Sequence, residues 1–299
     1  MKTKTISVGE AERMARELLD EDNNEELYDL AYKLLNQEEV HGSENDFHNF
    51  SLNYSRKDAY DLACDILEKG LEQFSRSVDL IADYLQVGTS CNRMAQCEKY
   101  YNQLLQIPKI RWTWRGFSFS IDYLLYLAND LNEDDLVLMK EKILSLADEY
   151  HTLFSMSEDP YICKANVYSF FNDNLAVEEI LMEAVNNIEV CPKCTLRLAD
   201  LLFERGDYDK SLEIINKCLY QSIQTQDSVN HGYLYYLSGL CKMVQLLRKS
   251  AFQDKDLVLD IYHDFSIAQK AGLQHTSYLR VMRRQIDILE TRSGIDYTD

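Results

Sequence analysis

Two cysteines separated by two residues, Cys191-Pro192-Lys193-Cys194, form the motif in this sequence with the clearest chemical precedent. Such a pair at a helix start can be a redox couple with a depressed thiol pKa, or half of a structural zinc site. A zinc site needs two further ligands, and no second pair of this kind or His-x-x-x-His spacing lies nearby. Redox pairs of this type accompany a βαβ unit, and no strand pattern is present. We therefore interpret the motif as a turn between helices with two partly buried thiols.

Other patterns that could support catalysis are missing from the sequence. The six histidines are scattered without metal-ligand spacing, and no phosphate-binding GxxxxGK[ST], GxGxxG, HExxH or GxSxG motif occurs. A Cys–His pair could still meet in the folded chain, since such partners need not be close in sequence. The sequence itself favours a protein that is not an enzyme, with no cofactor and no resident metal.

The composition bounds the fold class and the cellular compartment. Three prolines and ten glycines in 299 residues are too few for a sandwich or barrel, which needs many turns. The N-terminal residues lack the apolar core of a secretory signal, and no apolar run is long enough to span a membrane. Eight cysteines in such a chain are typical of reduced core thiols. We expect a cytoplasmic protein.

The net charge of -19 constrains the partners. Nucleic-acid binding draws most of its affinity from neutralising phosphates with Lys and Arg, so this acidic chain is a poor candidate for it. Anionic membranes are disfavoured for the same reason. A basic or neutral protein or peptide partner fits better. The sequence leaves the oligomeric state open.

A spacing of 34 residues, found twice, indicates the architecture that positions all of these residues. In the first case the apolar positions Ala63, Leu67 and Leu71 recur as Cys97, Tyr101 and Leu105. In the second case Ala165, Tyr168, Leu181 and Ala184 recur as Ala199, Leu202, Ile215 and Cys218. A fixed period of this size predicts stacked helical hairpins, each too small to bury its apolar face alone.

The segment that begins at Pro192 resembles the tetratricopeptide repeat. It has Leu198 and Ala199 in the first helix, Gly206 in the turn, and the small residues Ser211 and Cys218 in the second helix. Small residues at these points let the two helices approach closely. The resemblance implies an all-α fold, an α-α superhelix of about 13–14 antiparallel helices arranged as a solenoid.

The match to the repeat varies along the chain, which suggests three regions. Residues 1–41 fit a degenerate N-terminal helical pair. Residues 42–226 fit tetratricopeptide-like repeats, with an elongated pair at about 111–156. Residues 227–299 fit a long helical pair followed by a capping helix, whose Arg280, Arg283 and Arg284 suit the polar end that a solenoid needs.

In the tetratricopeptide family the first helices line a concave, partner-binding face, and the resemblance carries this role onto specific residues. In the elongated pair they are Trp112, Arg115, Phe119 and Asp122. In the later repeats they are Asn166, Lys193, Arg197 and Phe203. Exposed aromatics and arginines in a concavity are typical of binding hot spots, although aromatics at helical spacing also pack in cores. The family's carboxylate clamp is incomplete, because His48 and Leu52 stand where Lys and Asn are expected.

These features favour a non-enzymatic adaptor or scaffold that binds a peptide or helix of another protein in its concave groove. One alternative is a peptide-responsive regulator, because some bacterial helical-repeat regulators bind short signalling peptides and act through a partner. The third hypothesis is a thiol or zinc role for Cys191 and Cys194.

Overall fold

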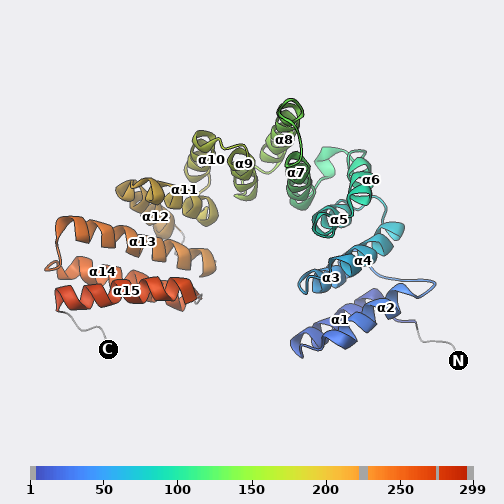
Figure 1. Cartoon of the computed structure of the whole chain (residues 1–299), viewed down its shortest axis with the longest axis horizontal. Helices are drawn as coiled ribbons and strands as arrows, with labels where there is room; N and C mark the ends of the chain where they lie inside the picture. Colours follow the sequence, from blue (N-terminus) through green and yellow to red (C-terminus); the bar gives the residue numbers. More distant parts are fainter. Residues whose placement is uncertain (1–4, 222–227, 274–275, 295–299) are drawn as a thin grey trace. The chain divides into compact units, whose positions relative to one another are not determined.

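The computed structural model describes residues 5–221, 228–273 and 276–294. Within these ranges every regular element is a helix: fifteen α-helices and one short 3-10 helix (Figure 1). The chain divides into two compact units, Met1–Phe154 and Ser155–Asp299, which are described separately.

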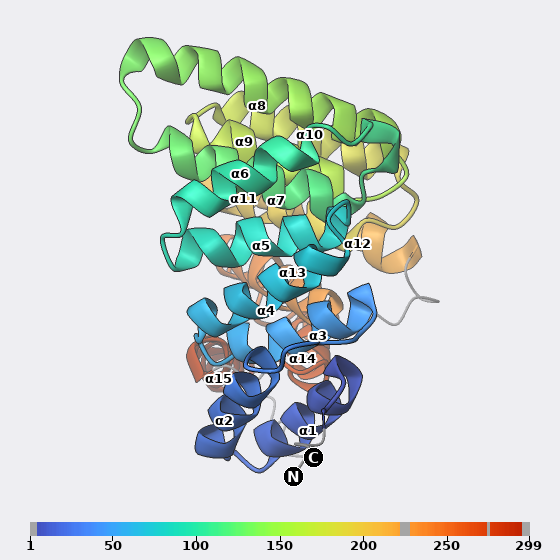
Figure 2. The same ribbon diagram turned by 90° about the vertical axis from the view of Figure 1, so that its right-hand side faces the viewer.

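The first unit contains four α-helical hairpins, stacked one upon the next from α1–α2 to α7–α8 (Figure 2). Its helices are α1 (Val8–Asp20), α2 (Asn24–Leu35), α3 (Glu44–Ser55), α4 (Tyr60–Gln73), α5 (Val78–Ser90), α6 (Met94–Leu104), the 3-10 helix η1 (Lys109–Arg111), α7 (Trp114–Ala128) and α8 (Glu133–Leu153).

In the first unit a hydroxyl caps the N-terminus of each first helix, beginning with Ser7 at α1. The side-chain oxygens of Ser43, Ser77 and Thr113 each accept a hydrogen bond from the backbone N–H three residues later, at 3.2 Å in all three cases. Such caps satisfy backbone donors that the helix cannot, and they fix the residue at which it begins. The starts of α3, α5 and α7, and so the register of their exposed faces, are therefore set locally by the sequence.

Small residues and large aromatic residues alternate in the core of the first unit. Gly70 faces Phe47 so closely that an added Cβ would lie 2.9 Å from its ring, and Gly88 likewise faces Cys97. Where α7 meets α8, the ring of Phe117 stacks on that of Tyr150 with centroids 5.1 Å apart. Gly88 lies inside α5, where the missing side chain permits the close approach of α6.

The second unit contains two repeats of ordinary length and three longer helices. They are α9 (Asp159–Phe170), α10 (Asn174–Asn187), α11 (Pro192–Arg205), α12 (Tyr208–Gln221), α13 (Ser228–Lys249), α14 (Lys255–Lys270) and α15 (Thr276–Ser293). Gly206 ends α11 with φ of 89°, a left-handed conformation that glycine adopts without strain.

The predicted all-α class of stacked, antiparallel helical hairpins is confirmed. The described residues hold fifteen α-helices, slightly more than the 13–14 expected. The proposed regions 1–41, 42–226 and 227–299 remain a prediction. No helix in the described ranges combines the length and the apolar character needed to cross a membrane.

Candidate functional site

A pocket of about 460 Å³ opens on the face shared by the first helices α3, α5 and α7. All of its lining residues belong to the first unit. Because consecutive helices are antiparallel, these three alternate helices run in the same direction, and residues four apart on each helix form layers across the pocket.

The first layer consists of His48 on α3, Asp83 on α5 and Arg115 on α7. One helical turn further along lie Leu52, Val87 and Phe119, which form an apolar layer. The next turn brings a second polar layer with Arg56, directly after α3, and Ser90 at the end of α5. The pocket is thus charged toward both ends, with an apolar layer between them. Ser51, Ser55 and Gln86 also line it, as does Tyr60 at the start of α4.

The buried carboxylate of Asp83, which is 6 % exposed, organises the first polar layer. Its Oδ2 lies 2.6 Å from Nδ1 of His48. An ionised carboxylate only accepts hydrogen bonds, so Nδ1 of His48 is the donor. A guanidinium nitrogen of Arg115 lies 3.4 Å from the same Nδ1. Both groups are donors, so this contact is not a hydrogen bond. In the described residues the Arg115 guanidinium has no carboxylate partner.

Aromatic rings form one wall of the pocket. Trp114 is 46 % exposed, and its ring meets that of Phe119 edge to face with centroids 6.1 Å apart. The Arg115 guanidinium lies 5.5 Å from the Trp114 ring centroid, within the range of a cation–π contact. Tryptophan and arginine in a concave, partly desolvated site are the residues that most often dominate binding energy.

Of the four residues expected from the elongated pair, Arg115 and Phe119 line this pocket. Trp112 does not, because it is 3 % exposed and its indole N–H donates to the backbone oxygen of Ile107 at 3.0 Å. It packs in the core, and its neighbour Trp114 takes the exposed position. Asp122 is exposed further along α7 and is not part of the lining.

The four expected residues of the second unit are held in local contacts. The Arg197 guanidinium donates to the Asn166 side-chain oxygen. Lys193 pairs with Asp159 at 3.0 Å, and Phe203 packs edge to face against Tyr208 at 5.0 Å. The guanidinium of Arg197 and the ammonium of Lys193 are therefore already engaged within the unit, in contrast to that of Arg115.

Sequence reasoning misses several pocket residues. The family pattern marks His48 and Leu52 only as failures of a carboxylate clamp, and it gives Asp83 no role. A signal is present, because His48 and Asp83 are separated by 35 residues, one repeat plus one.

The cysteine motif lies in the core of the second unit. Cys191 and Cys194 are both buried. Burial raises the pKa of Cys191 to about 11 and raises that of Cys194 further. A raised pKa suppresses the thiolate, which is both the nucleophile and the metal ligand. The environment of these thiols supports a packing role.

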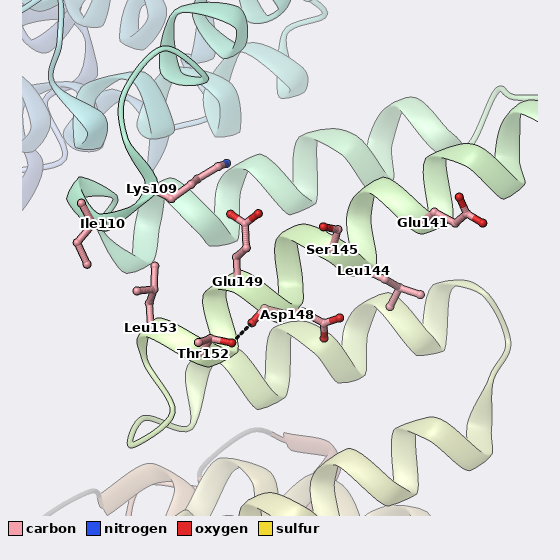
Figure 3. A pocket seen from close by; sticks show the side chains of 9 residues that line it. All are labelled: Lys109, Ile110, Glu141, Leu144, Ser145, Asp148, Glu149, Thr152 and Leu153. Carbon is pink, nitrogen blue, oxygen red and sulfur yellow. Dashed lines mark hydrogen bonds between the residues drawn. The ribbon is translucent and has the colours of Figure 1, made fainter.

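A wider hollow of about 880 Å³ lies beside α8 (Figure 3). Its lining comes from η1 (Lys109 and Ile110) and one face of α8, where the Thr152 hydroxyl donates to the backbone oxygen of Asp148 at 2.8 Å. A surface built by one helix and one short turn offers few converging groups. We therefore favour the pocket of α3, α5 and α7.

Only one group of potential metal ligands gathers within the described parts of the chain, namely Asp260, His263 and Asp264 on α14. The ammonium of Lys242 lies 2.7 Å from Asp260 and 2.8 Å from Asp264. The ammonium already supplies the positive charge that a bound metal ion would bring to these carboxylates, so the group is better explained as an ion-paired cluster.

Comparison with known proteins agrees with the fold. Residues 135–270 match the RNPP family C-terminal domain, a tetratricopeptide-like family. The match begins after the last pocket residue, Phe119, and covers most of the second unit. No curated protein matches the sequence.

Several solved structures are similar in fold. A thermophilic TPR protein of Thermus thermophilus is 16% identical, covering 62% of this chain and 94% of its own, with a TM-score of 0.47. A tetratricopeptide repeat protein from Parabacteroides merdae is 13% identical, and the match covers 94% of this chain and 98% of that protein with a TM-score of 0.47. A human IFIT1 dimer with PPP-AAAA is 14% identical, and the match covers 98% of this chain and 66% of the IFIT1 chain with a TM-score of 0.42. Likenesses this distant carry no argument about the site, and the PPP-AAAA belongs to IFIT1.

The stacked hairpins, the spacing of 34 residues and the match over 135–270 support the same assignment. The chain has the stacked-hairpin fold of tetratricopeptide-repeat proteins, and its residues 135–270 resemble the RNPP family C-terminal domain.

Proposed function

We propose that the chain is a non-enzymatic adaptor whose pocket on α3, α5 and α7 binds a peptide segment of another protein. Tetratricopeptide-like domains are in general protein-interaction domains, which is the coarse function of this chain. The observation that carries the finer proposal is the guanidinium of Arg115, which faces a pocket beside the exposed Trp114 without an acidic partner among the described residues.

The pocket is organised before any partner arrives, which favours binding. The hydroxyl caps fix the helix starts, and Asp83 and His48 hold each other at 2.6 Å. A preformed site loses less conformational freedom on binding than a mobile one, so more of the contact energy is available as affinity. The net charge of -19 supports a partner that is basic or neutral outside the pocket.

The test is covalent capture at the pocket in the native cell. A photo-crosslinking residue in place of Leu52 should capture one partner, and mass spectrometry should locate the cross-link in one peptide of it. Arg115→Ala with Phe119→Ala should abolish the cross-link.

The matched control is Lys210→Ala with Tyr220→Ala, which also removes one cation and one aromatic from exposed positions in the second unit. It should leave the cross-link unchanged. If the pocket variant and the control captured the same protein equally well, the pocket would not be the binding site.

A second candidate is the peptide-responsive regulator, and the match of residues 135–270 to the RNPP family C-terminal domain favours it. Small-angle scattering distinguishes the two candidates. A regulator should become more compact when its peptide is added, whereas an adaptor should keep the same radius of gyration apart from the mass of the peptide.

A further inference from the structure

The residues that line the pocket carry a net positive charge, whereas the whole chain carries a net charge of -19. Asp83 is the only acid among the lining residues, and His48 covers it at 2.6 Å. The lining cations are Arg56 and Arg115. Neither guanidinium pairs with a carboxylate in the described part of the chain, although the protein carries 50 acidic residues. The free charge in the pocket is therefore positive.

The two arginines lie toward opposite ends of the pocket. The Arg115 guanidinium lies beside His48, at 3.4 Å. Arg56 follows His48 by eight residues, and α3 continues to the residue before it. At a rise of about 1.5 Å per residue, the two ends of the pocket are about 12 Å apart.

The surface between these two positive ends has an apolar centre, although Ser51, Ser55 and Gln86 also line the pocket. Leu52 lies one helical turn from His48 and one from Arg56, and Val87 and Phe119 face the same layer. The exposed ring of Trp114 adds an aromatic wall. A ligand that satisfied both arginines would have to place an apolar side chain between its two anionic groups.

We propose that this pocket recognises an extended peptide segment in which two acidic side chains, four residues apart, flank an aliphatic or aromatic residue. An extended chain rises about 3.3 Å per residue, so a spacing of four spans about 13 Å, close to the rise of about 12 Å along α3 between the two ends of the pocket. The proposal rests on the proposed peptide-binding function and adds the chemistry of the ligand to it.

Arginine suits this role better than lysine. Its planar guanidinium binds a carboxylate through two parallel hydrogen bonds, and it is less strongly hydrated than an ammonium. A single exposed ion pair contributes little to the free energy of binding. Arg115, however, is partly buried against Trp114, where water and salt screen a charge pair less. The ligand's two carboxylates thus give selectivity as well as orientation.

The test uses the full chain and fluorescein-labelled peptides of eleven residues with amidated C-termini. One set has the frame Glu-x-Leu-x-Glu, and the matched set has Gln-x-Leu-x-Gln. Further sets place the two glutamates one or eight residues apart. A copy of the Gln set with a free C-terminal carboxylate tests whether a terminus, rather than side chains, supplies the charge. Fluorescence anisotropy measures the dissociation constant of each.

We expect the four-residue Glu frame to bind about a hundredfold more tightly than the Gln frame and about tenfold more tightly than the other spacings, since each good ion pair in a partly desolvated site contributes about tenfold and the other spacings satisfy one arginine at a time. Arg115→Gln and Arg56→Gln should each remove about tenfold of this preference, and Arg115→Lys should keep part of it. Tryptophan fluorescence checks that each variant is folded.

Equal binding of the Glu and Gln frames by the wild type would overturn the inference while leaving the pocket as a peptide site. Tight binding of the free-acid Gln set alone would overturn it in favour of a terminal carboxylate. Failure of every peptide would also overturn it, and the Leu52 cross-link would then decide separately whether the proposed function fails too.

Discussion

The substitution Gly88→Ala tests the close approach of α5 and α6, which positions the α5 wall of the pocket. A Cβ at residue 88 would lie 2.5 Å from the Sγ of Cys97. Heavy atoms in contact prefer about 3.5–4.0 Å, so the methyl group would overlap the sulfur by about 1 Å. Cys97 is fully buried, so its sulfur has little room to move.

Two opposing effects decide the result. Alanine inside a helix is more favourable than glycine by about 1 kcal/mol. Overpacking a core costs about 1–3 kcal/mol. We expect Gly88→Ala to lower the free energy of unfolding by about 1 kcal/mol in the wild type, and to raise it by about 1 kcal/mol in a Cys97→Ala background, where the sulfur is gone.

Urea unfolding followed by tryptophan fluorescence is the assay, because both tryptophans, Trp112 and Trp114, lie in the first unit and report on it alone. The four proteins of the double-mutant cycle give a coupling of about 2 kcal/mol if the packing is as described. If Gly88→Ala stabilised the chain equally in both backgrounds, the close approach of α5 and α6 would be refuted.

Four further predictions concern other parts of the chain. Burial lowers the pKa of Lys109 from 10.5 to about 8, so between pH 8 and 10.5 the unfolded chain binds more protons than the folded one and the free energy of unfolding rises with pH. Lys109→Met should stabilise the first unit at pH 7 and remove this rise, as urea titrations at several pH values can measure. An unchanged pH profile would contradict this prediction. His48→Ala should cost about 1–3 kcal/mol because it leaves the buried Asp83 carboxylate without its partner, and Asp83→Asn in the same background should restore part of that loss in the same assay. Cys191 and Cys194 should react with iodoacetamide far more slowly than the half-exposed Cys91, as peptide mass spectrometry of timed samples can show, and fast labelling of the pair would revive a thiol role. Gly206→Ala should cost about 1 kcal/mol from its positive φ alone, since an added Cβ meets nothing within 4 Å, and circular dichroism during thermal unfolding measures it.

The fold could be predicted from the sequence because its signals are local and repeated. The period of 34 residues corresponds to the length of one hairpin. The hydroxyl caps and the left-handed Gly206 each determine where a helix begins or ends, so they could be interpreted without the rest of the chain. Gly88 shows the limit of this approach. A glycine near polar residues predicts a turn, and only the packing partner Cys97 shows why it lies inside a helix.

The site was harder to predict because it depends on register and on contacts between hairpins. The family positions led to Arg115 and Phe119, but also to the buried Trp112 in place of Trp114. Trp112 lies before α7, whose start is fixed by the cap residue Thr113, and Trp114 is the first residue of the helix. Likewise, the pairing of His48 with Asp83 is formed across two hairpins, and neither residue alone suggests it.

The central claim is that the pocket of α3, α5 and α7 is the partner-binding site. The most direct measurement is the cross-link from residue 52 in the native cell, compared between the otherwise unchanged chain, the variant with Arg115→Ala and Phe119→Ala, and the control variant with Lys210→Ala and Tyr220→Ala. The account predicts one partner peptide, lost in the pocket variant and retained in the control. A cross-link that survives in the pocket variant, or no captured peptide in any of the three chains, would contradict it.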